Sequence, residues 1–522
     1  MSGEAQRETP PAARAWLTLD QIWLFAGVAF LGLRPLLTTI MPHDFWWHMA
    51  TGRIIVQTGQ IPTVDSFSYT RAGEPFYNQS WLAQVGMYGL HQLGGIPLIV
   101  LVQALMIAFA YGMLLRLSLR QGGSLRLSVG FLLLCTLPAS FDNWLVRPQT
   151  YTLPLFIASL YLLTAWRDPR GARATSLPQA RAFWPPLLLL PAFGLLWVNL
   201  HGSFVLGGGL IAITFVGEIV WRLAEAKANQ RPAVPRPPLW HLLIAGALTG
   251  LTWLVNPRGL EVLGYVRNLL SSSQVTRLVT EWSPPSIRDT NGTIFFLFIL
   301  VGIVILSYAR RRPDPVDMLL TGVFLWLALG ATRNNIWFVA VATPLLVRQL
   351  AAWRREDAVT PPAYQGLPVL NAAVAGMIGL MLVLALPWVK PALGLPPSVG
   401  ALLDPTTPVA AVEALKADQQ RPSRLFHAMG YGSYLIWAAP EQKVWADPRI
   451  ELYPFGQWLD YAQLSSGREV EPLLERYAIN GLLLSNKDQA DLLTWVKAHP
   501  NQWAQRYSDD EASYFVRVSS GQ

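Results

Sequence analysis

The stretch HDFWWHMATGRIIVQTGQIPTVDSFSYTRAGEPFYNQSWL, residues 43–82, decides how this chain is organised. It follows a membrane-length apolar segment, 19–41, and belongs to a polar and aromatic loop, 42–96. Asp44 therefore stands where a first transmembrane helix leaves the membrane. An acid at that boundary, followed by such a long loop, indicates a site that acts on a lipid-linked substrate.

The overall composition is that of a membrane protein. Of the 522 residues, 52% are hydrophobic and 14% are charged, whereas soluble domains contain about 25% charged residues. The 22 Trp and 16 Tyr residues suit a protein with many anchors at the membrane–water interface. The net charge of +8 is spread over separate loops and forms no single basic stripe, so it does not indicate a nucleic acid partner.

About eleven apolar segments are candidate transmembrane helices, because a crossing needs about 20 mainly apolar residues. We expect spans near 19–41, 97–116, 127–141, 150–166, 184–200, 203–221, 240–255, 293–309, 316–331, 335–350 and 367–388. Two of them, 127–141 and 240–255, are short for a full crossing. The predicted fold is an all-α polytopic membrane protein with a small C-terminal soluble α/β domain.

Basic residues predict the orientation of these spans. If the N-terminal tail, 1–18, is cytoplasmic, every short loop on that side is basic, as the positive-inside rule requires. These residues are Arg116, Arg120, Arg126, Arg167, Arg170, Arg173, Arg181, Arg222, Lys227, Arg231, Arg236, Arg310, Arg311, Arg312, Arg348, Arg354 and Arg355. The transmembrane domain is then 19–388, while the loops 42–96 and 256–292 and the domain 389–522 lie outside.

Several polar residues at span ends fall on the same exterior side as the first loop. They are Arg147, His201, Arg258, Glu281 and Arg333. Each has an ordinary explanation as a helix cap or a headgroup contact. Exterior arginines, however, run against the positive-inside bias, and a guanidinium fork matches the geometry of phosphate. We therefore expect these residues to bind substrate.

Asp44 has three interpretations that its sequence context leaves open. It could cap a helix over 45–58. His48 lies about one helical turn further along the same face, so the two could bind a divalent metal ion. Alternatively, His48 could orient the carboxylate and bind substrate beside it. A second, interfacial helix is expected at 80–94, where Trp81, Val85 and Tyr88 repeat at helical spacing.

The C-terminal region predicts an α/β unit. The short apolar segments 424–427, 443–448 and 479–485 alternate with helical patterns at 453–465, 470–477 and 487–498, which favours a parallel sheet. The stretch 503–518 predicts a terminal hairpin. Asp447, Arg449 and Glu451 could form an edge that binds an acceptor, although a structural role is the simpler interpretation.

The first loop resembles that of GT-C fold glycosyltransferases. The shared order is an acid after the first span, a short helix, Gly59 and Pro62, an aromatic-polar stretch, and a helix that opens with Trp81. The nearest branches are the protein mannosyltransferases, the aminoarabinose transferases and the RgtA/B/C/D-like glycosyltransferases. The resemblance implies a multi-pass protein of the bacterial cytoplasmic membrane, a polyprenyl-phosphate sugar as donor, and Asp44 as general base or metal contact.

On this resemblance, we expect inverting transfer of a hexosyl or pentosyl group to an extracytoplasmic glycan, lipid or protein acceptor. Exterior arginines would stabilise the leaving phosphate. The cofactor is unknown, and a divalent metal ion is one option. Phe45 stands where many relatives carry a second acid. The alternative hypothesis is therefore a non-catalytic membrane scaffold or lipid-binding subunit that retains the fold.

Overall fold

The computed structural model describes residues 17–167, 187–228, 236–271, 279–310, 312–353 and 367–518. Nearly all of the predicted cytoplasmic tail lies outside these ranges. So do the predicted basic-loop residues Arg170, Arg173, Arg181, Arg231, Arg311, Arg354 and Arg355.

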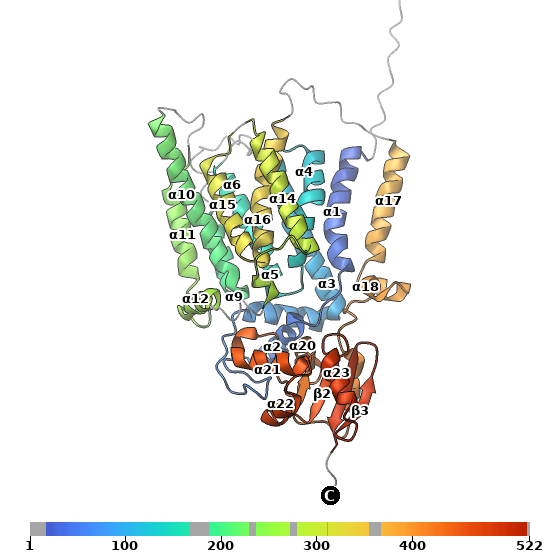
Figure 1. The fold of residues 1–522 in the computed structure, drawn as a ribbon. Helices are drawn as coiled ribbons and strands as arrows, with labels where there is room; N and C mark the ends of the chain where they lie inside the picture. The colour runs from blue at the N-terminus through green and yellow to red at the C-terminus, as the bar shows by residue number, and fades with distance from the viewer. Residues whose placement is uncertain are drawn as a thin grey trace, which may run out of the picture.

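A bundle of helices makes up most of the described chain, with the C-terminal region at one end of it (Figure 1). The bundle helices are α1 (Leu19–Leu37), α3 (Trp81–Arg120), α4 (Leu125–Phe131), α6 (Leu153–Arg167), α9 (Leu189–Leu200), α10 (Val205–Lys227), α11 (Trp240–Thr252), α14 (Thr290–Ser307), α15 (Pro315–Gly330), α16 (Asn335–Ala351) and α17 (Pro368–Leu384). Shorter connecting helices are α5 (Pro148–Tyr151), α12 (Glu261–Ser271), η4 (Gly202–Phe204), η5 (Thr280–Trp282), η6 (Thr332–Asn334) and η7 (Lys390–Leu393).

The lengths of these helices support a polytopic membrane protein. Each predicted span overlaps a bundle helix. Among the described residues, four segments are both long and apolar enough to cross a membrane: Leu19–Leu37, Trp81–Arg120, Gly202–Lys227 and Thr290–Ser307. The membrane class of the fold is therefore confirmed, whereas the number of eleven spans stays a prediction.

The first loop folds into α2 (Asp44–Thr58) and the opening part of α3. Asp44 is the first residue of α2 and does not cap it; the N-cap position is His43, whose side chain makes no capping bond. α3 bends at Gly94 and Gly95, where Gly95 has a φ of 65° that favours glycine. The bend separates the opening part of α3, which was predicted to be interfacial, from its apolar span.

Close packing holds α2 against α3. Gly52 of α2 lies against the backbone of Gln84, and a Cβ atom at position 52 would stand only 2.1 Å from the Gln84 carbonyl oxygen. Only glycine permits this approach without a shift of the backbone. The contact fixes the direction of α2, and therefore the place of Asp44 at its start.

The short predicted span 127–141 ends early for a local reason. After α4 the chain forms a π-helical turn, η1 (Leu132–Thr136), and then the 3₁₀ helix η2 (Pro138–Asn143). Pro138 lacks the N–H group that a continuing helix needs. The segment after η2 therefore leaves the bundle direction and carries Arg147 toward the first loop.

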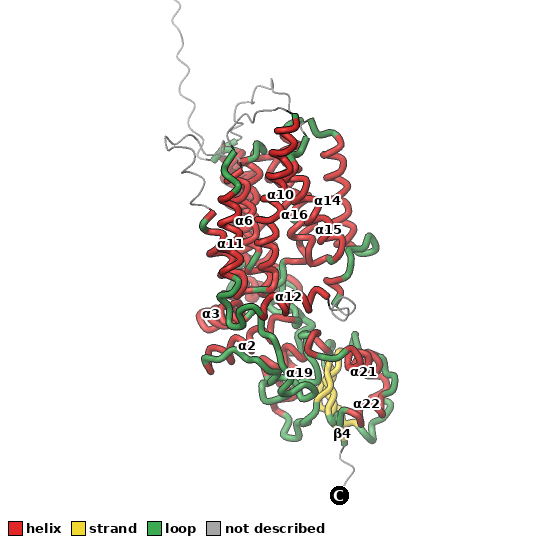
Figure 2. Tube along the Cα trace, turned by 90° about the vertical axis from the view of Figure 1, so that its left-hand side faces the viewer, coloured by secondary structure: helices red, strands yellow, loops and turns green. Residues whose placement is uncertain are grey.

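The strands that the structure describes all lie in the C-terminal region (Figure 2). They are β1 (Leu425–His427), β2 (Gly481–Ser485), β3 (Trp503–Ser508) and β4 (Ala512–Arg517), in the order β1-β2-β4-β3. The helices around them are α18 (Pro397–Gly400), α19 (Val409–Ala417), α20 (Met429–Ala438), η8 (Ile450–Leu452), α21 (Phe455–Ser465), α22 (Val470–Arg476) and α23 (Ala490–Lys497).

The sheet is mixed, not parallel throughout. β1 pairs with β2 in parallel, but β4 pairs antiparallel with both β2 and β3. The predicted terminal hairpin is present, and its second strand extends the sheet. The prediction of a strand at 443–448 is wrong, because Val444 makes only an isolated bridge with Ser68 of the first loop.

The first loop and the C-terminal region share one core. Phe45 and Trp46 of α2 belong to the same buried apolar cluster as Leu425 and Tyr434. The Trp47 backbone N–H donates to the Ser433 hydroxyl at 3.1 Å, across 386 positions of sequence. The C-terminal region is therefore fixed on the loop that carries Asp44.

Candidate functional site

A cavity of about 870 Å³ is lined by the end of the bundle, the first loop and the C-terminal region. Six of the seven predicted site residues line it, and Arg258 does not. The six are Asp44, His48, Arg147, His201, Glu281 and Arg333. They come from α2, from the segment after η2, from the turn before η4, and from η5 and η6.

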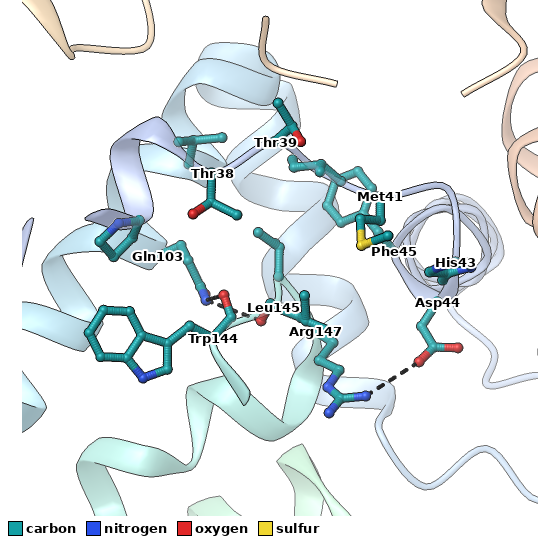
Figure 3. Close-up of a pocket in the computed structure, with 14 residues that line it drawn as sticks. Thr38, Thr39, Met41, His43, Asp44, Phe45, Gln103, Trp144, Leu145 and Arg147 are labelled. Carbon is teal, nitrogen blue, oxygen red and sulfur yellow. Dashed lines mark hydrogen bonds and ion pairs between the residues drawn. The ribbon is translucent and has the colours of Figure 1, made fainter. Parts of the chain in front are cut away.

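Two carboxylates and two guanidinium groups alternate in this cavity. Arg147 Nη1 lies 3.9 Å from Asp44 Oδ2 and 2.5 Å from Glu281 Oε2. Arg333 Nη1 lies 3.3 Å from Glu281 Oε1. Figure 3 shows the Asp44 and Arg147 side chains pointing toward each other. Since Arg147 contacts Glu281 more closely, Asp44 is only partly neutralised, and its side chain remains 36% exposed.

The surroundings divide the two carboxylates into different roles. Burial raises the pKa of Asp44; the charge of Arg147 opposes this, and the charge of Glu281 adds to it. Burial would raise the pKa of Glu281 too, but Arg147 and Arg333 together hold that pKa below its usual value. Glu281 therefore stays ionised as a counter-ion, and Asp44 is the stronger base.

The two histidines are held as neutral hydrogen-bond donors. The Ser203 backbone N–H donates to His201 Nδ1 at 3.1 Å, and the Gln84 side-chain amide lies 3.1 Å from His48 Nδ1. A backbone N–H can only donate, so the His201 proton sits on Nε2, and the Gln84 amide group favours the same tautomer in His48. Burial lowers the pKa of both rings well below the usual value.

The predicted pairing of Asp44 with His48 does not appear among the contacts of Asp44. These are with Arg147 and with Trp47, whose indole N–H lies 3.5 Å from Asp44 Oδ1. Within the residues that the structure describes, no group of three or more His, Cys, Asp or Glu side chains could hold a metal ion. The nearest charged neighbours of both carboxylates are guanidinium groups, which repel a cation. The residues do not fit a divalent metal, and we assign no step to one.

Arg258 lines a separate pocket of about 230 Å³, together with Tyr77 and Trp81. Tyr77 also lines the larger cavity and stacks on Tyr265 with ring centroids 4.5 Å apart. The Arg258 guanidinium lies over the Tyr77 ring at 5.1 Å and pairs with Glu261 at 3.2 Å. Arg258 therefore lies near the cavity but apart from the charges around Asp44.

A buried cluster was missed by the sequence analysis. Arg449 Nη2 lies 2.6 Å from Asp65 Oδ1 and 2.6 Å from Asp447 Oδ2, and the Tyr453 hydroxyl donates to Asp447 at 2.6 Å. Asp65 stands 384 positions before Arg449, so no local spacing signals this pair. Asp447 and Arg449 thus tie the C-terminal region to the first loop, while Glu451 lines the cavity.

A small pocket of about 40 Å³, called the apolar groove below, adjoins the charged cluster. It is lined mainly by apolar side chains, among them Pro35 of α1, Val100 of α3 and Val146. Asp44 and Arg147 line both this groove and the larger cavity (Figure 3). The site therefore joins an apolar surface to a polar space at one carboxylate and one guanidinium.

Known structures share this architecture, although no family model and no curated protein matches the sequence. The archaeal oligosaccharyltransferase AglB from Archaeoglobus fulgidus, in complex with an inhibitory peptide and a dolichol-phosphate, is similar with a TM-score of 0.54 and 12% identity, over 96% of this chain and 75% of that one. The apo form of the Archaeoglobus fulgidus oligosaccharyltransferase gives a TM-score of 0.53 and 12% identity, over 95% and 74%.

A bacterial structure aligns over nearly its whole length. ArnT from Cupriavidus metallidurans bound to undecaprenyl phosphate is similar with a TM-score of 0.50 and 14% identity, over 98% of this chain and 99% of that one. Identities this low carry the fold and not the activity. The chain therefore has the GT-C fold, the integral-membrane fold of these glycosyltransferases.

Proposed function

We propose that this protein is an integral-membrane glycosyltransferase that moves a sugar from a polyprenyl-phosphate donor to an extracytoplasmic acceptor. The observation that carries the proposal is that Asp44 and Arg147 belong to both the apolar groove and the polar cavity. The groove, at about 40 Å³, would contact only the part of the lipid chain next to the phosphate, and the sugar and acceptor would lie in the cavity. The similar structures that hold dolichol-phosphate and undecaprenyl phosphate support this class of donor.

In this proposal Asp44 is the general base. Its carboxylate takes the proton of an acceptor hydroxyl while that oxygen forms a bond to the anomeric carbon. The bond from that carbon to the phosphate oxygen breaks, and its electron pair leaves with polyprenyl phosphate. Attack opposite the phosphate inverts the anomeric centre. The raised pKa of Asp44 suits the role, because a stronger base accepts the proton more readily.

The guanidinium groups of Arg147 and Arg333 would stabilise the leaving phosphate. Glu281 contacts both, at 2.5 Å and 3.3 Å, and so holds two cations close together. A phosphate that entered beside them would gain charge-assisted hydrogen bonds from a preformed pair. His201 adds a neutral N–H donor on Nε2 in the same cavity. Arg258, in its own pocket, would contact a more distant part of the substrate.

The proposal includes a topology. The transmembrane domain 19–388 would cross a bacterial cytoplasmic membrane eleven times, with the tail 1–18 inside and 389–522 outside. In a Cys135→Ser background, an impermeant thiol reagent added from outside should label a cysteine at position 467 but not at position 312. The opposite labelling would reverse the orientation.

The decisive experiment measures donor turnover. Purified protein in nanodiscs would be given a panel of undecaprenyl-phosphate hexoses and pentoses, and release of undecaprenyl phosphate would be followed. Asp44→Asn should lower turnover about 10²–10⁴-fold but keep lipid binding. Asp460→Asn is a matched control, because Asp460 pairs with Arg476 in the C-terminal region, and neither the cavity nor the groove includes either residue. Lipid binding without turnover of any donor by the wild type would favour the non-catalytic scaffold or lipid-binding subunit.

A further inference from the structure

Glu451 is a cavity-lining carboxylate that the proposed chemistry leaves unused. It belongs to η8 of the C-terminal region and lines the same cavity as Asp44, Arg147 and Arg333. Its side chain is exposed within that cavity. Among the described residues, no Lys, Arg or His lies within ion-pair distance of it, although Arg147 and Arg333 line the same space and pair with Glu281. Glu451 is therefore available to a ligand.

The backbone of Glu451 is fixed from both sides. Two positions before it, Arg449 is held by Asp65 and Asp447; two positions after it, the Tyr453 hydroxyl donates to Asp447. Arg449 is 2% exposed and both aspartates are fully buried. The backbone at Glu451 is therefore already fixed, so only the side chain loses conformational freedom when it binds a ligand.

The charge of Asp44 acts on Glu451, which lines the same cavity. Burial raises the pKa of Glu451, and the charge of Asp44 adds to this, while Arg449 lowers it. Two carboxylates that share a space are best satisfied by a ligand with several hydrogen-bond donors, because an ionised carboxylate can only accept. A molecule with one hydroxyl would satisfy Asp44 alone.

We propose that Glu451 binds the acceptor, and that this acceptor presents neighbouring hydroxyl groups, as a saccharide does. One hydroxyl would meet Asp44 and react; another would donate to Glu451. Met429, Pro448 and Ile450 line the cavity beside Glu451 and offer apolar contact to the carbon face of a sugar ring. The C-terminal region would thereby select the acceptor. This inference rests on the proposed function for the identity of the reaction, but binding can be measured without it.

The test uses methyl α-D-glucopyranoside and methyl α-D-mannopyranoside as saccharide probes, and N-acetylserine methylamide as a probe with one hydroxyl. Binding to the full-length protein in nanodiscs would be measured by saturation-transfer NMR with no donor present, so that no turnover occurs. Glu451→Ala and Glu451→Gln should weaken saccharide binding about tenfold, the effect of losing a hydrogen bond to a charged group. Glu451→Asp should restore part of it. Glu413→Gln, an exposed carboxylate on α19, is the matched control.

Turnover then separates this inference from the proposed function. With whichever donor the wild type uses, Glu451→Gln should raise the KM for the glycoside about tenfold and leave the donor KM unchanged. If saccharide binding depends on Glu451 but the wild type turns over no donor, the proposed function is wrong and the saccharide-binding site stands. Equal glycoside binding by wild type and Glu451→Ala, or binding of the serine probe alone, would overturn the inference.

Discussion

Replacing Arg449 by methionine should destabilise the protein more than any single surface change. The guanidinium is 2% exposed and lies 2.6 Å from each of two fully buried carboxylates, those of Asp65 and Asp447. Removing one partner of a buried ion pair costs about 3–5 kcal/mol, because the remaining charge stays buried without compensation. Two carboxylates lose their partner here, so we expect a value near the upper end of that range. Arg449→Lys keeps the positive charge but loses the two-pronged guanidinium group, and should lower the free energy of unfolding by less than Arg449→Met.

The control is Arg476→Met. Arg476 pairs with Asp460 at 2.9 Å, but its side chain is 65% exposed, so its loss should cost less than about 1 kcal/mol. Both variants would be unfolded with guanidinium chloride in nanodiscs and followed by tryptophan fluorescence, since Trp445, Trp458 and Trp503 lie in the C-terminal core. If Arg449→Met loses no more stability than Arg476→Met, the cluster does not hold the two regions together.

Three further outcomes follow from the charges around Asp44. Asp44→Asn should lower sugar transfer about 10²–10⁴-fold at unchanged thermal stability, with Asp44→Glu intermediate, since general-base assistance has that magnitude; wild-type turnover by Asp44→Asn would refute it. The transfer rate should rise with pH through the raised pKa of Asp44, because only the ionised carboxylate accepts a proton. Glu281→Gln should move this rise in rate to lower pH, because it removes a charge that raises the pKa of Asp44. A rise that moves to higher pH would contradict the assignment. Dialysis against EDTA should leave turnover unchanged, because the nearest charged neighbours of both carboxylates are arginines. If EDTA stops turnover and added Mg²⁺ or Mn²⁺ restores it, the conclusion that the site holds no divalent metal is wrong.

The membrane class and the gathering of six residues followed from the sequence because sidedness is encoded locally. Hydropathy and basic loops predict a side for each span end, and they predict the same side for Asp44, Arg147 and Glu281. The side of the membrane does not, however, determine where a residue lies within the plane of the membrane. The same reasoning assigns Arg258 to that side, yet Arg258 lines a different pocket from Asp44.

Contacts between residues far apart in the sequence could not be predicted. The short apolar run within 443–448 is typical of a strand, but the backbone of Val444 bonds to Phe67 and Tyr69 of the first loop. Likewise, nothing in the sequence around Asp65 indicates that it pairs with Arg449. Neither contact leaves a periodic pattern in the sequence, because the partners are more than 370 positions apart. The hydrogen bond from Thr70 to Trp445 spans a similar distance in sequence. Such contacts depend on the finished tertiary fold.

The shared core of α2 and the C-terminal region imposes an order on biosynthesis. Trp47 leaves the ribosome 386 residues before Ser433, the side chain that accepts its N–H. At about 5–20 residues per second, the first loop waits roughly 20–80 s for its packing partner. During that interval Phe45 and Trp46 have no C-terminal core to enter. The membrane surface or a chaperone must cover these aromatic rings until the last quarter of the chain arrives.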